Sequence, residues 1–206
     1  NYLNTLYGLR RIIDPVSGKP PIERRRLHST HYGFICPIET PEGQPCGFKK
    51  ALSMMTHITF GCPGKSLIDF IKTNGLINLE DIYPTEFKNK TKVFVNGSWI
   101  GMHQNPKKLV DLLIGYRRNG LINVYISISW DIMNNEILCL TDNGRLCKPV
   151  YIIKDNRLLV EPKHIKGILD DKLRWDDLIT GFRPHKKTID YYDCEIKDYK
   201  KEGFDS

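Results

Sequence analysis

Apolar side chains recur at helical spacing in five short stretches of the chain. Gly75 stands where such a stretch stops, and glycine is the usual residue just beyond a helix end. The pair Asn105-Pro106 suits a helix start, because the N–H that proline lacks needs no partner in the first turn. The pattern predicts helices over residues 2–12, 48–59, 66–74, 106–118 and 164–180, with Ser66 capping the third.

Alternation of apolar and polar residues predicts strands in the middle of the chain. Asn96-Gly97 lies between Val93–Val95 and Ser98–Ile100 and is typical of a type I′ hairpin turn, because both residues tolerate a positive φ. The strictly alternating run Ile122–Trp130 indicates a half-buried strand. Three more strands are expected over 136–141, 145–153 and 157–160, joined by turns at 142–144 and 155–156.

These elements predict an α+β fold made of several small mixed modules of short helices and antiparallel hairpins. The break at Gly61–Gly64 is a plausible module boundary. We therefore divide the chain into residues 1–60, 61–130 and 131–206, the last ending in a polar tail. The chain opens at Asn1 without Met, with apolar residues already at helical spacing. We expect a piece of a larger subunit, a processed mature protein being the alternative.

Composition narrows the class of protein. The chain has 206 residues, 40% of them apolar, and no apolar run approaches the length of a membrane span, so no membrane partner is expected. The formal charge is +7, and residues 1–60 hold eight Lys and Arg against four Asp and Glu, which favours a nucleic-acid partner without establishing one. The six cysteines are irregularly spaced, which favours reduced thiols and an intracellular protein.

The stretch from Arg24 to Gly47 has neither a helical nor a strand period. It is rich in Pro and Gly, so little of its backbone can pair with itself, and ordering it costs conformational entropy. We therefore expect that its shape is used. Its leading Arg24-Arg25-Arg26 is either a solvated turn or an edge that contacts phosphates.

Two pairs in this stretch could suggest zinc. His28 and His31 are close enough in sequence to chelate a metal, but Cys36 and Cys46 are ten residues apart with prolines between them. Structural zinc sites pair their ligands within a few residues. Hydrogen-bonded histidines and buried thiols are the preferred interpretation.

Two other candidate chemistries are also weak. Glu39 and Glu42 could form an acid–base pair, yet no nucleophile lies nearby, and a carboxylate there can instead accept backbone N–H groups or an Arg. The run Gly61–Ser66 ends in Gly-Lys-Ser, but a phosphate-binding loop needs four residues between its glycines and this run has two. An ordinary turn into a helix is preferred.

Three motifs together indicate a family. Leu27–Gly33 followed by Cys36–Gln44 resembles the second-largest (beta-type) subunit of multisubunit DNA-directed RNA polymerases. Thr91–His103 is similar to the next module of that subunit, and Thr141–Pro149 to the third. The motifs keep the family's order, and the later ones match the eukaryotic, archaeal and large-DNA-virus type. The resemblance implies an internal fragment that holds the fork region and the two following modules.

The resemblance also implies roles for individual residues. The segment before the Leu-His motif would form a fork loop at the downstream edge of the transcription bubble, with Asp14, Ser17 and Lys19 in the loop. The residues expected near nucleic acid or the active centre are Arg24, Arg25, Arg26, Glu42 and Gln44. The last two would influence nucleotide addition indirectly.

The family implies partners and a limit on activity. Its catalytic Mg²⁺ is held by the largest subunit, so we expect no cofactor on this chain, no catalytic residue in it and no activity of the fragment alone. The expected partners are the largest and other polymerase subunits, the template and non-template DNA strands and the RNA transcript, in a nucleus or a cytoplasmic virus factory or virion. The alternative function is a free-standing module that binds nucleic acid or protein and reuses this scaffold.

Overall fold

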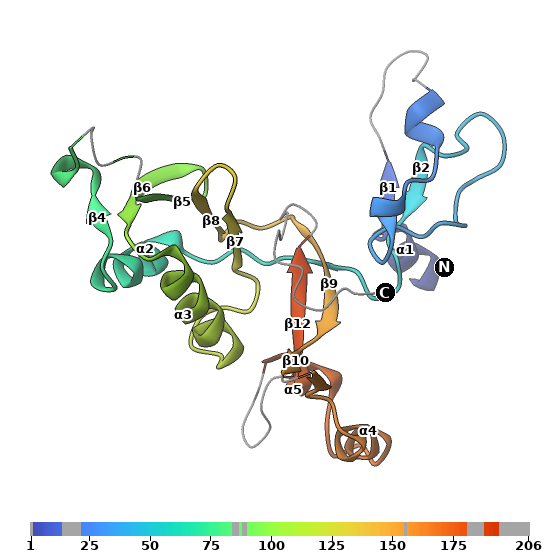
Figure 1. Cartoon of the computed structure of the whole chain (residues 1–206). Helices are drawn as coiled ribbons and strands as arrows, with labels where there is room; N and C mark the ends of the chain where they lie inside the picture. The colour runs from blue at the N-terminus through green and yellow to red at the C-terminus, as the bar shows by residue number, and fades with distance from the viewer. Residues whose placement is uncertain are drawn as a thin grey trace. The chain divides into compact units, whose positions relative to one another are not determined.

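The computed structural model describes residues 2–13, 22–83, 87, 90–154, 156–180 and 188–193. The chain forms two compact units (Figure 1). The first unit comprises Asn1–His57 and Leu146–Lys148, and the second comprises Ile58–Arg145 and Pro149–Ser206.

The first unit contains little regular structure. Its elements are α1 (Tyr2–Gly8), β1 (Arg11–Ile13), the 3₁₀ turns η1 (Ile22–Arg25) and η2 (Ser29–His31), and β2 (Lys49–Ala51). β1 and β2 pair antiparallel, with Arg11 opposite Ala51. Because the rest of the unit is irregular, side chains as well as ladders hold its loops.

The second unit is built on a five-stranded sheet of order β4-β6-β5-β8-β7, against which α2 and α3 pack (Figure 1). Its buried core joins side chains of both helices, such as Ile71 and Leu113, to strand residues Val93 and Ile137. The pair β5·β8 is parallel and the other pairs are antiparallel. These elements are α2 (Gly64–Thr73), β4 (Ile77–Asn78), η3 (Leu79–Asp81), β5 (Thr91–Val95), β6 (Ser98–His103), α3 (Pro106–Arg118), β7 (Ser127–Asp131) and β8 (Glu136–Leu140).

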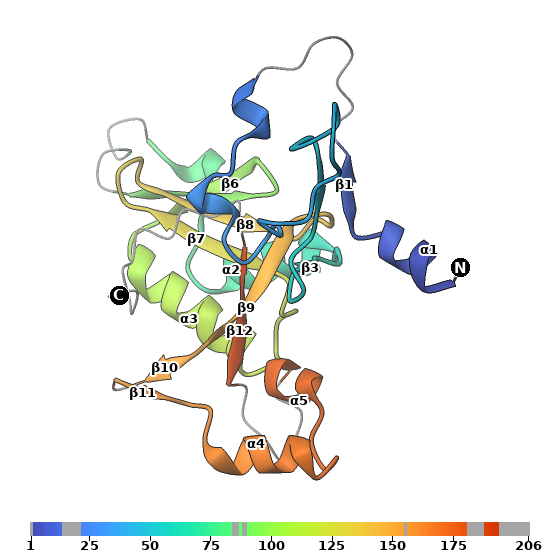
Figure 2. The ribbon, with the colours of Figure 1, turned by 90° about the vertical axis from the view of Figure 1, so that its right-hand side faces the viewer.

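A smaller three-stranded sheet has the order β12-β9-β3, and a short β10–β11 hairpin leads into α4 and α5 (Figure 2). These elements are β3 (His57–Ile58), β9 (Leu146–Tyr151), β10 (Ile153–Lys154), β11 (Arg157–Leu158), α4 (Pro162–Leu169), α5 (Trp175–Thr180) and β12 (Ile189–Asp193). The mixture of short helices and small, mostly antiparallel sheets confirms the predicted α+β class.

Local signals with a strict stereochemical cause are confirmed. Asn96 and Gly97 have φ of 49° and 79° and join β5 to β6, as the type I′ prediction requires. α3 begins at Pro106, and Gly75 follows α2 with φ of 94°. Ser66 is not the cap that we predicted, because α2 already begins at Gly64.

Four of the predicted elements are wrong in kind or extent. Residues 48–59 form β2 and β3 rather than a helix, because distant backbone groups satisfy this segment: Cys36 N–H donates to Ala51 O at 2.8 Å and Leu52 N–H to Arg10 O at 2.8 Å. Similarly, the predicted helix over 2–12 ends at Gly8, since the residues that follow it pair with β2.

The remaining corrections concern turns. Of the predicted strand over 122–130, only the part in β7 is extended, because Asn123 accepts the N–H of Tyr125 at 3.0 Å and of Ile126 at 3.2 Å in a turn. The predicted helix over 164–180 is split into α4 and α5 by Asp171, which has φ of 56°. β8 and β9 are consecutive but belong to different sheets.

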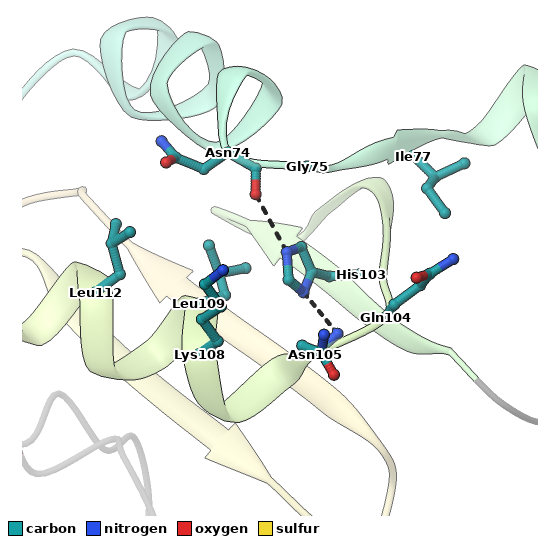
Figure 3. A pocket seen from close by; sticks show the side chains of 9 residues that line it. All are labelled: Asn74, Gly75, Ile77, His103, Gln104, Asn105, Lys108, Leu109 and Leu112. Atoms are coloured by element: carbon teal, nitrogen blue, oxygen red, sulfur yellow. Dashed lines mark hydrogen bonds between the residues drawn. The ribbon is translucent and has the colours of Figure 1, made fainter.

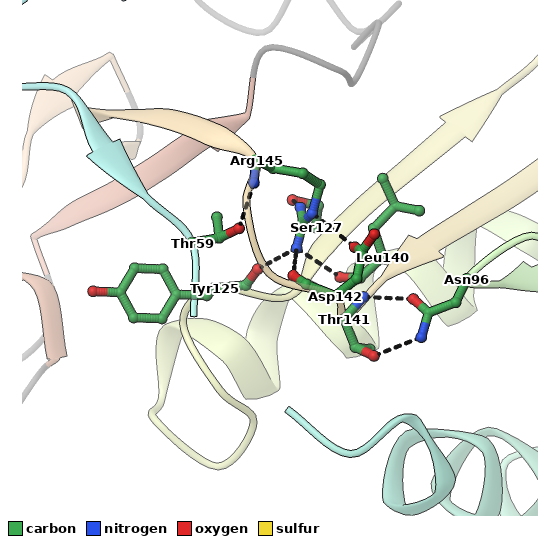
Figure 4. A network of polar contacts seen from close by, with 8 residues as sticks. All are labelled: Thr59, Asn96, Tyr125, Ser127, Leu140, Thr141, Asp142 and Arg145. Atoms are coloured by element: carbon green, nitrogen blue, oxygen red, sulfur yellow. Dashed lines mark hydrogen bonds and ion pairs between the residues drawn. The ribbon is translucent and has the colours of Figure 1, made fainter. Parts of the chain in front are cut away.

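A buried arginine organises one edge of the second unit (Figure 4). Arg145 is 3% exposed, and its Nη2 donates to three carbonyl oxygens, those of Tyr125 at 3.0 Å, Asp142 at 3.1 Å and Leu140 at 3.3 Å. Its Nε donates to the Asp142 carboxylate at 3.0 Å, and Nη1 donates to the Ser127 hydroxyl. One side chain therefore ties together two strand ends and the turn between β8 and β9.

Side-chain hydrogen bonds also fix the backbone at Thr141 and Arg145, on either side of this turn. Thr59 exchanges hydrogen bonds with the backbone of Arg145, accepting its N–H at Oγ1 at 3.0 Å and donating its own N–H to Arg145 O at 2.9 Å. Asn96 binds both the N–H and the hydroxyl of Thr141 at 2.8 Å (Figure 4). The exposed turn at 142–144 is therefore held at both ends by buried residues, Thr141 and Arg145.

A hollow of about 360 Å³ lies beside α3 in the second unit (Figure 3). His103 lines it, but both of its ring nitrogens are engaged: Nδ1 accepts the N–H of Asn105 at 3.0 Å and Nε2 donates to Asn74 O at 3.3 Å. Its role is therefore structural, joining the end of β6 to the end of α2.

In the part of the chain that the structure describes, no helix combines the length and apolar character needed to span a bilayer. Its cysteines, Cys36, Cys46, Cys62, Cys139 and Cys147, are free thiols. Burial raises the pKa of Cys139 to about 12.

Candidate functional site: an arginine-braced loop

The segment 40–48, here called the braced loop, is held by Arg25. Arg25 ends η1, and its Nη1 donates to Gln44 O at 2.6 Å and to Cys46 O at 2.7 Å. Its guanidinium carbon also lies 4.2 Å from the centre of the Phe48 ring. Because arginine carries a planar set of donors, one side chain can fix two carbonyls and cover an aromatic face at once.

Glycine is required at one position of the braced loop. Gly47 is buried with φ of 79°, and its N–H donates to Thr40 Oγ1 at 2.7 Å. A Cβ built at this position would lie 2.7 Å from both Cα and O of Arg25. The loop therefore packs directly against the backbone of η1, and only a residue without a side chain permits that approach.

The structure brings two of the predicted site residues together. Arg25 binds the backbone of Gln44, whereas the side chain of Gln44 is exposed. Glu42 is exposed, and no hydrogen bond or ion pair joins its carboxylate to the described part of the chain. Arg24 precedes Arg25 in η1, and Arg26 directly follows η1. The predicted fork-loop residues Asp14, Ser17 and Lys19 lie outside the described residues.

The histidines and cysteines of this region have other partners. His28 Nδ1 lies 2.7 Å from the Thr30 hydroxyl and accepts the Thr30 N–H at the start of η2. Backbone N–H groups of Ile38 and Glu39 lower the pKa of Cys36 by stabilising its thiolate. Among the residues that the structure describes, no three His, Cys, Asp or Glu side chains are grouped to hold a metal.

Lys148, which is distant in sequence, contacts the turn that contains Tyr32 and Phe34 in the first unit. Lys148 Nζ donates to Tyr32 O at 3.0 Å and lies 4.7 Å from the ring centre of Phe34. Burial lowers the pKa of this lysine. Sequence reasoning missed this contact, since 116 residues separate Lys148 from Tyr32. The only available signal was that both belong to motifs of the same family.

We expect Lys148→Met to loosen the turn at residues 29–35. The variant keeps most of the apolar stem but loses a hydrogen bond and a cation–π contact, which together are worth about 1 kcal/mol. Hydrogen exchange of peptides covering this turn should become about fivefold faster. Lys154→Met, in the exposed hairpin strand β10, is the control, and equal effects of the two changes would contradict the assignment.

Two protein-family models match the chain. The model described as RNA polymerase Rpb2, domain 3, matches residues 1–58, which include the braced loop. The model described as RNA polymerase Rpb2, domain 4, matches residues 93–154, which include Arg145. Together they cover more than half of the chain, in the order that the motifs predict.

Curated proteins agree with the family models. The chain is 38% identical to the DNA-directed RNA polymerase II subunit RPB2 of Encephalitozoon cuniculi, over 96% of this chain and 17% of that protein. It is 40% identical to the subunit of the same name in Schizosaccharomyces pombe, over 85% of this chain and 15% of that protein. It is also 30% identical to the DNA-directed RNA polymerase subunit 2 of Acanthamoeba polyphaga mimivirus, over 95% of this chain.

The chain therefore matches one limited region of these relatives. The chain spans about a sixth of the length of these curated relatives, and nearly all of the chain is covered by them. The two family models match consecutive domains of one subunit, over residues 1–58 and 93–154 of this chain. The chain belongs to the family of second-largest, Rpb2-type subunits of DNA-directed RNA polymerases, and it corresponds to the region of domains 3 and 4.

Proposed function

We propose that this chain contributes to DNA-templated RNA synthesis as part of a polymerase second subunit, by holding the fork of the transcription bubble and bracing the active centre. The observation that carries the proposal is the double hydrogen bond from Arg25 to the braced loop, in a chain of this family. The loop that the resemblance assigns to the active centre is thus tied to the segment that it assigns to the fork.

The geometry supports an indirect role. A loop held by Arg25 and Gly47 presents Glu42 in a defined place, because its anchoring carbonyls cannot move independently of η1. Glu42 has no partner among the described residues and is free to meet another subunit, substrate or strand. A small displacement of such a group costs much of the rate when geometry limits the chemistry.

The proposal includes partners that the chain does not itself contain. These are the largest and other polymerase subunits, the two DNA strands and the RNA transcript, and catalytic Mg²⁺ is proposed to be held by the largest subunit. The chain alone is then expected to be inactive. Its curated relatives are polymerase subunits of eukaryotes, archaea and a virus, which supports an intracellular place of action.

Reconstituted polymerase containing the full-length subunit tests the proposal. We expect Arg25→Ala to slow elongation about tenfold, since the braced loop loses both charge-assisted hydrogen bonds. Glu42→Ala should also change the rate per nucleotide, while leaving assembly with the largest subunit intact. The measurement is single-nucleotide addition on a preformed template–transcript hybrid.

The control is Lys166→Ala in α4, which removes an exposed positive charge without touching the braced loop. Normal elongation by the Arg25 and Glu42 variants would refute the bracing role. A subunit that never co-purifies with a largest subunit would instead favour the free-standing binding module.

A further inference from the structure

The first unit includes three residues that the sequence places far from the rest of it. Leu146–Lys148 belongs to this unit in the fold, whereas the family model that covers these residues is the one described as domain 4. The model described as domain 3 ends at residue 58. The domain 4 region therefore contributes a strand segment, and with it a lysine, to the unit that carries the braced loop.

The Lys148 side chain lies over the turn at residues 32–34. Its Nζ donates to Tyr32 O at 3.0 Å and lies 5.3 Å and 4.7 Å from the ring centres of Tyr32 and Phe34. A Cβ built on Gly33 would lie 2.8 Å from Lys148 Cδ, so the stem of the lysine rests on the glycine backbone. One carbonyl and two aromatic rings thus surround the ammonium group, a combination that suits a cation.

A buried threonine holds the same turn from the other direction in sequence. Thr56 is 3% exposed, and its hydroxyl oxygen lies 3.0 Å from Gly33 O and 2.8 Å from Phe34 O. Together the side chains of Thr56 and Lys148 reach the carbonyl oxygens of three consecutive residues. The position of this turn therefore depends on side-chain donors that come from elsewhere in the chain.

The turn is joined to the strand that follows the braced loop. Ile35 forms an antiparallel bridge with Leu52, and the Cys36 N–H donates at 2.8 Å to the oxygen of Ala51, the last residue of β2. β2 begins at residue 49, directly after the braced loop. Packed and hydrogen-bonded elements of this kind can carry energetic coupling from one segment to the next.

We infer that Lys148 is a positioning residue for the braced loop: by fixing the turn at residues 32–34, it fixes the strand from which that loop extends. The inference rests on the proposed function, because that function gives the position of the braced loop a consequence for elongation. It adds a residue from the domain 4 region, in which the sequence predicted no residue near the active centre.

Hydrogen exchange of reconstituted polymerase that contains the full-length subunit tests the structural step. We expect Lys148→Met to accelerate exchange about threefold in peptides covering residues 40–50, beyond its local effect on the turn. Lys148→Arg keeps a cation and N–H donors, and should accelerate exchange there by less than about 1.5-fold. Lys154→Met, in the exposed strand β10, is the control and should change nothing in these peptides.

Single-nucleotide addition by the same enzymes, expressed per assembled enzyme, tests the functional step. We expect Lys148→Met to lower the maximal rate about threefold with little change in the apparent KM for the nucleotide, and Lys148→Arg to restore most of the rate. In an Arg25→Ala background the braced loop has already lost its anchor. Lys148→Met should then slow addition by less than about 1.5-fold, a non-additivity that a general loss of stability would not produce.

Either of two results would overturn the inference. The first is unchanged exchange at residues 40–50 in Lys148→Met, and the second is a pair of rate effects, from Lys148→Met and Arg25→Ala, that simply multiply. If Lys148→Met does not assemble, the milder Lys148→Gln, which keeps an N–H donor for Tyr32 O, decides by the same two measurements. Normal elongation by Arg25→Ala would instead refute the proposed function, while the exchange measurement still decides whether Lys148 positions the loop.

Discussion

Arg145→Met is expected to destabilise the second unit by about 3 kcal/mol, because it leaves buried carbonyl groups without their donor. The arginine is 3% exposed and donates to carbonyls of Tyr125, Leu140 and Asp142. Methionine fills part of the volume but supplies no donor. Each carbonyl that stays buried and unpaired then opposes folding.

Tryptophan fluorescence during urea unfolding measures this effect selectively. All three tryptophans, Trp99, Trp130 and Trp175, belong to the second unit, so their signal reports that unit alone. Arg145→Lys should recover little of the loss, since an ammonium cannot reach the same set of acceptors. Arg157→Met, at an exposed position in β11, is the matched control. An unfolding midpoint for Arg145→Met equal to that of the control would contradict the role of the network.

Gly47→Ala is expected to release the braced loop, with an effect of similar size on local stability. Two costs combine: a positive φ, which is unfavourable for alanine by about 1–2 kcal/mol, and a methyl group 2.7 Å from Cα and O of Arg25. The backbone of η1 cannot yield as a flexible side chain would. We therefore expect hydrogen exchange in peptides covering residues 40–50 to accelerate about 100-fold.

A second glycine of the same loop is the matched control. Gly43 has φ of 82°, but a Cβ built there meets nothing within 4 Å. Gly43→Ala therefore carries only the conformational cost and should accelerate exchange about tenfold. If the proposed function is right, Gly47→Ala should slow elongation more than Gly43→Ala does. Equal exchange rates for the two variants would show that the close approach to Arg25 does not matter.

The sequence predicted those elements whose signals are local. Asn96-Gly97 specifies its turn because both residues accept positive φ, and Pro106 specifies a helix start because its ring fixes its own φ. The predicted helix over 48–59 was wrong because its residues pair with strands elsewhere, which no local period reveals. Short apolar runs are ambiguous between helix and strand for this reason.

In the candidate site too, the sequence indicated some of the residues but not the contacts between them. Its motifs indicated Arg25 and Gln44 as neighbours of an active centre, and they placed both in one stretch without regular structure. The hydrogen bonds that join Arg25 to this loop were not predictable, since carbonyl groups carry no side-chain signal. Lys148 was missed because its partner, the Tyr32 carbonyl, lies 116 residues away along the chain.

By itself, the sequence determined the family, the α+β class and the turns that demand special backbone angles, because motif order and φ preferences are properties of adjacent residues. The tertiary structure alone decided how the irregular stretch from Arg24 to Gly47 is held. Its backbone pairs with itself only in short turns such as η2, so its shape also depends on hydrogen bonds made by the side chains of Arg25, Thr40 and Lys148. Contacts of that kind exist only once the chain has folded.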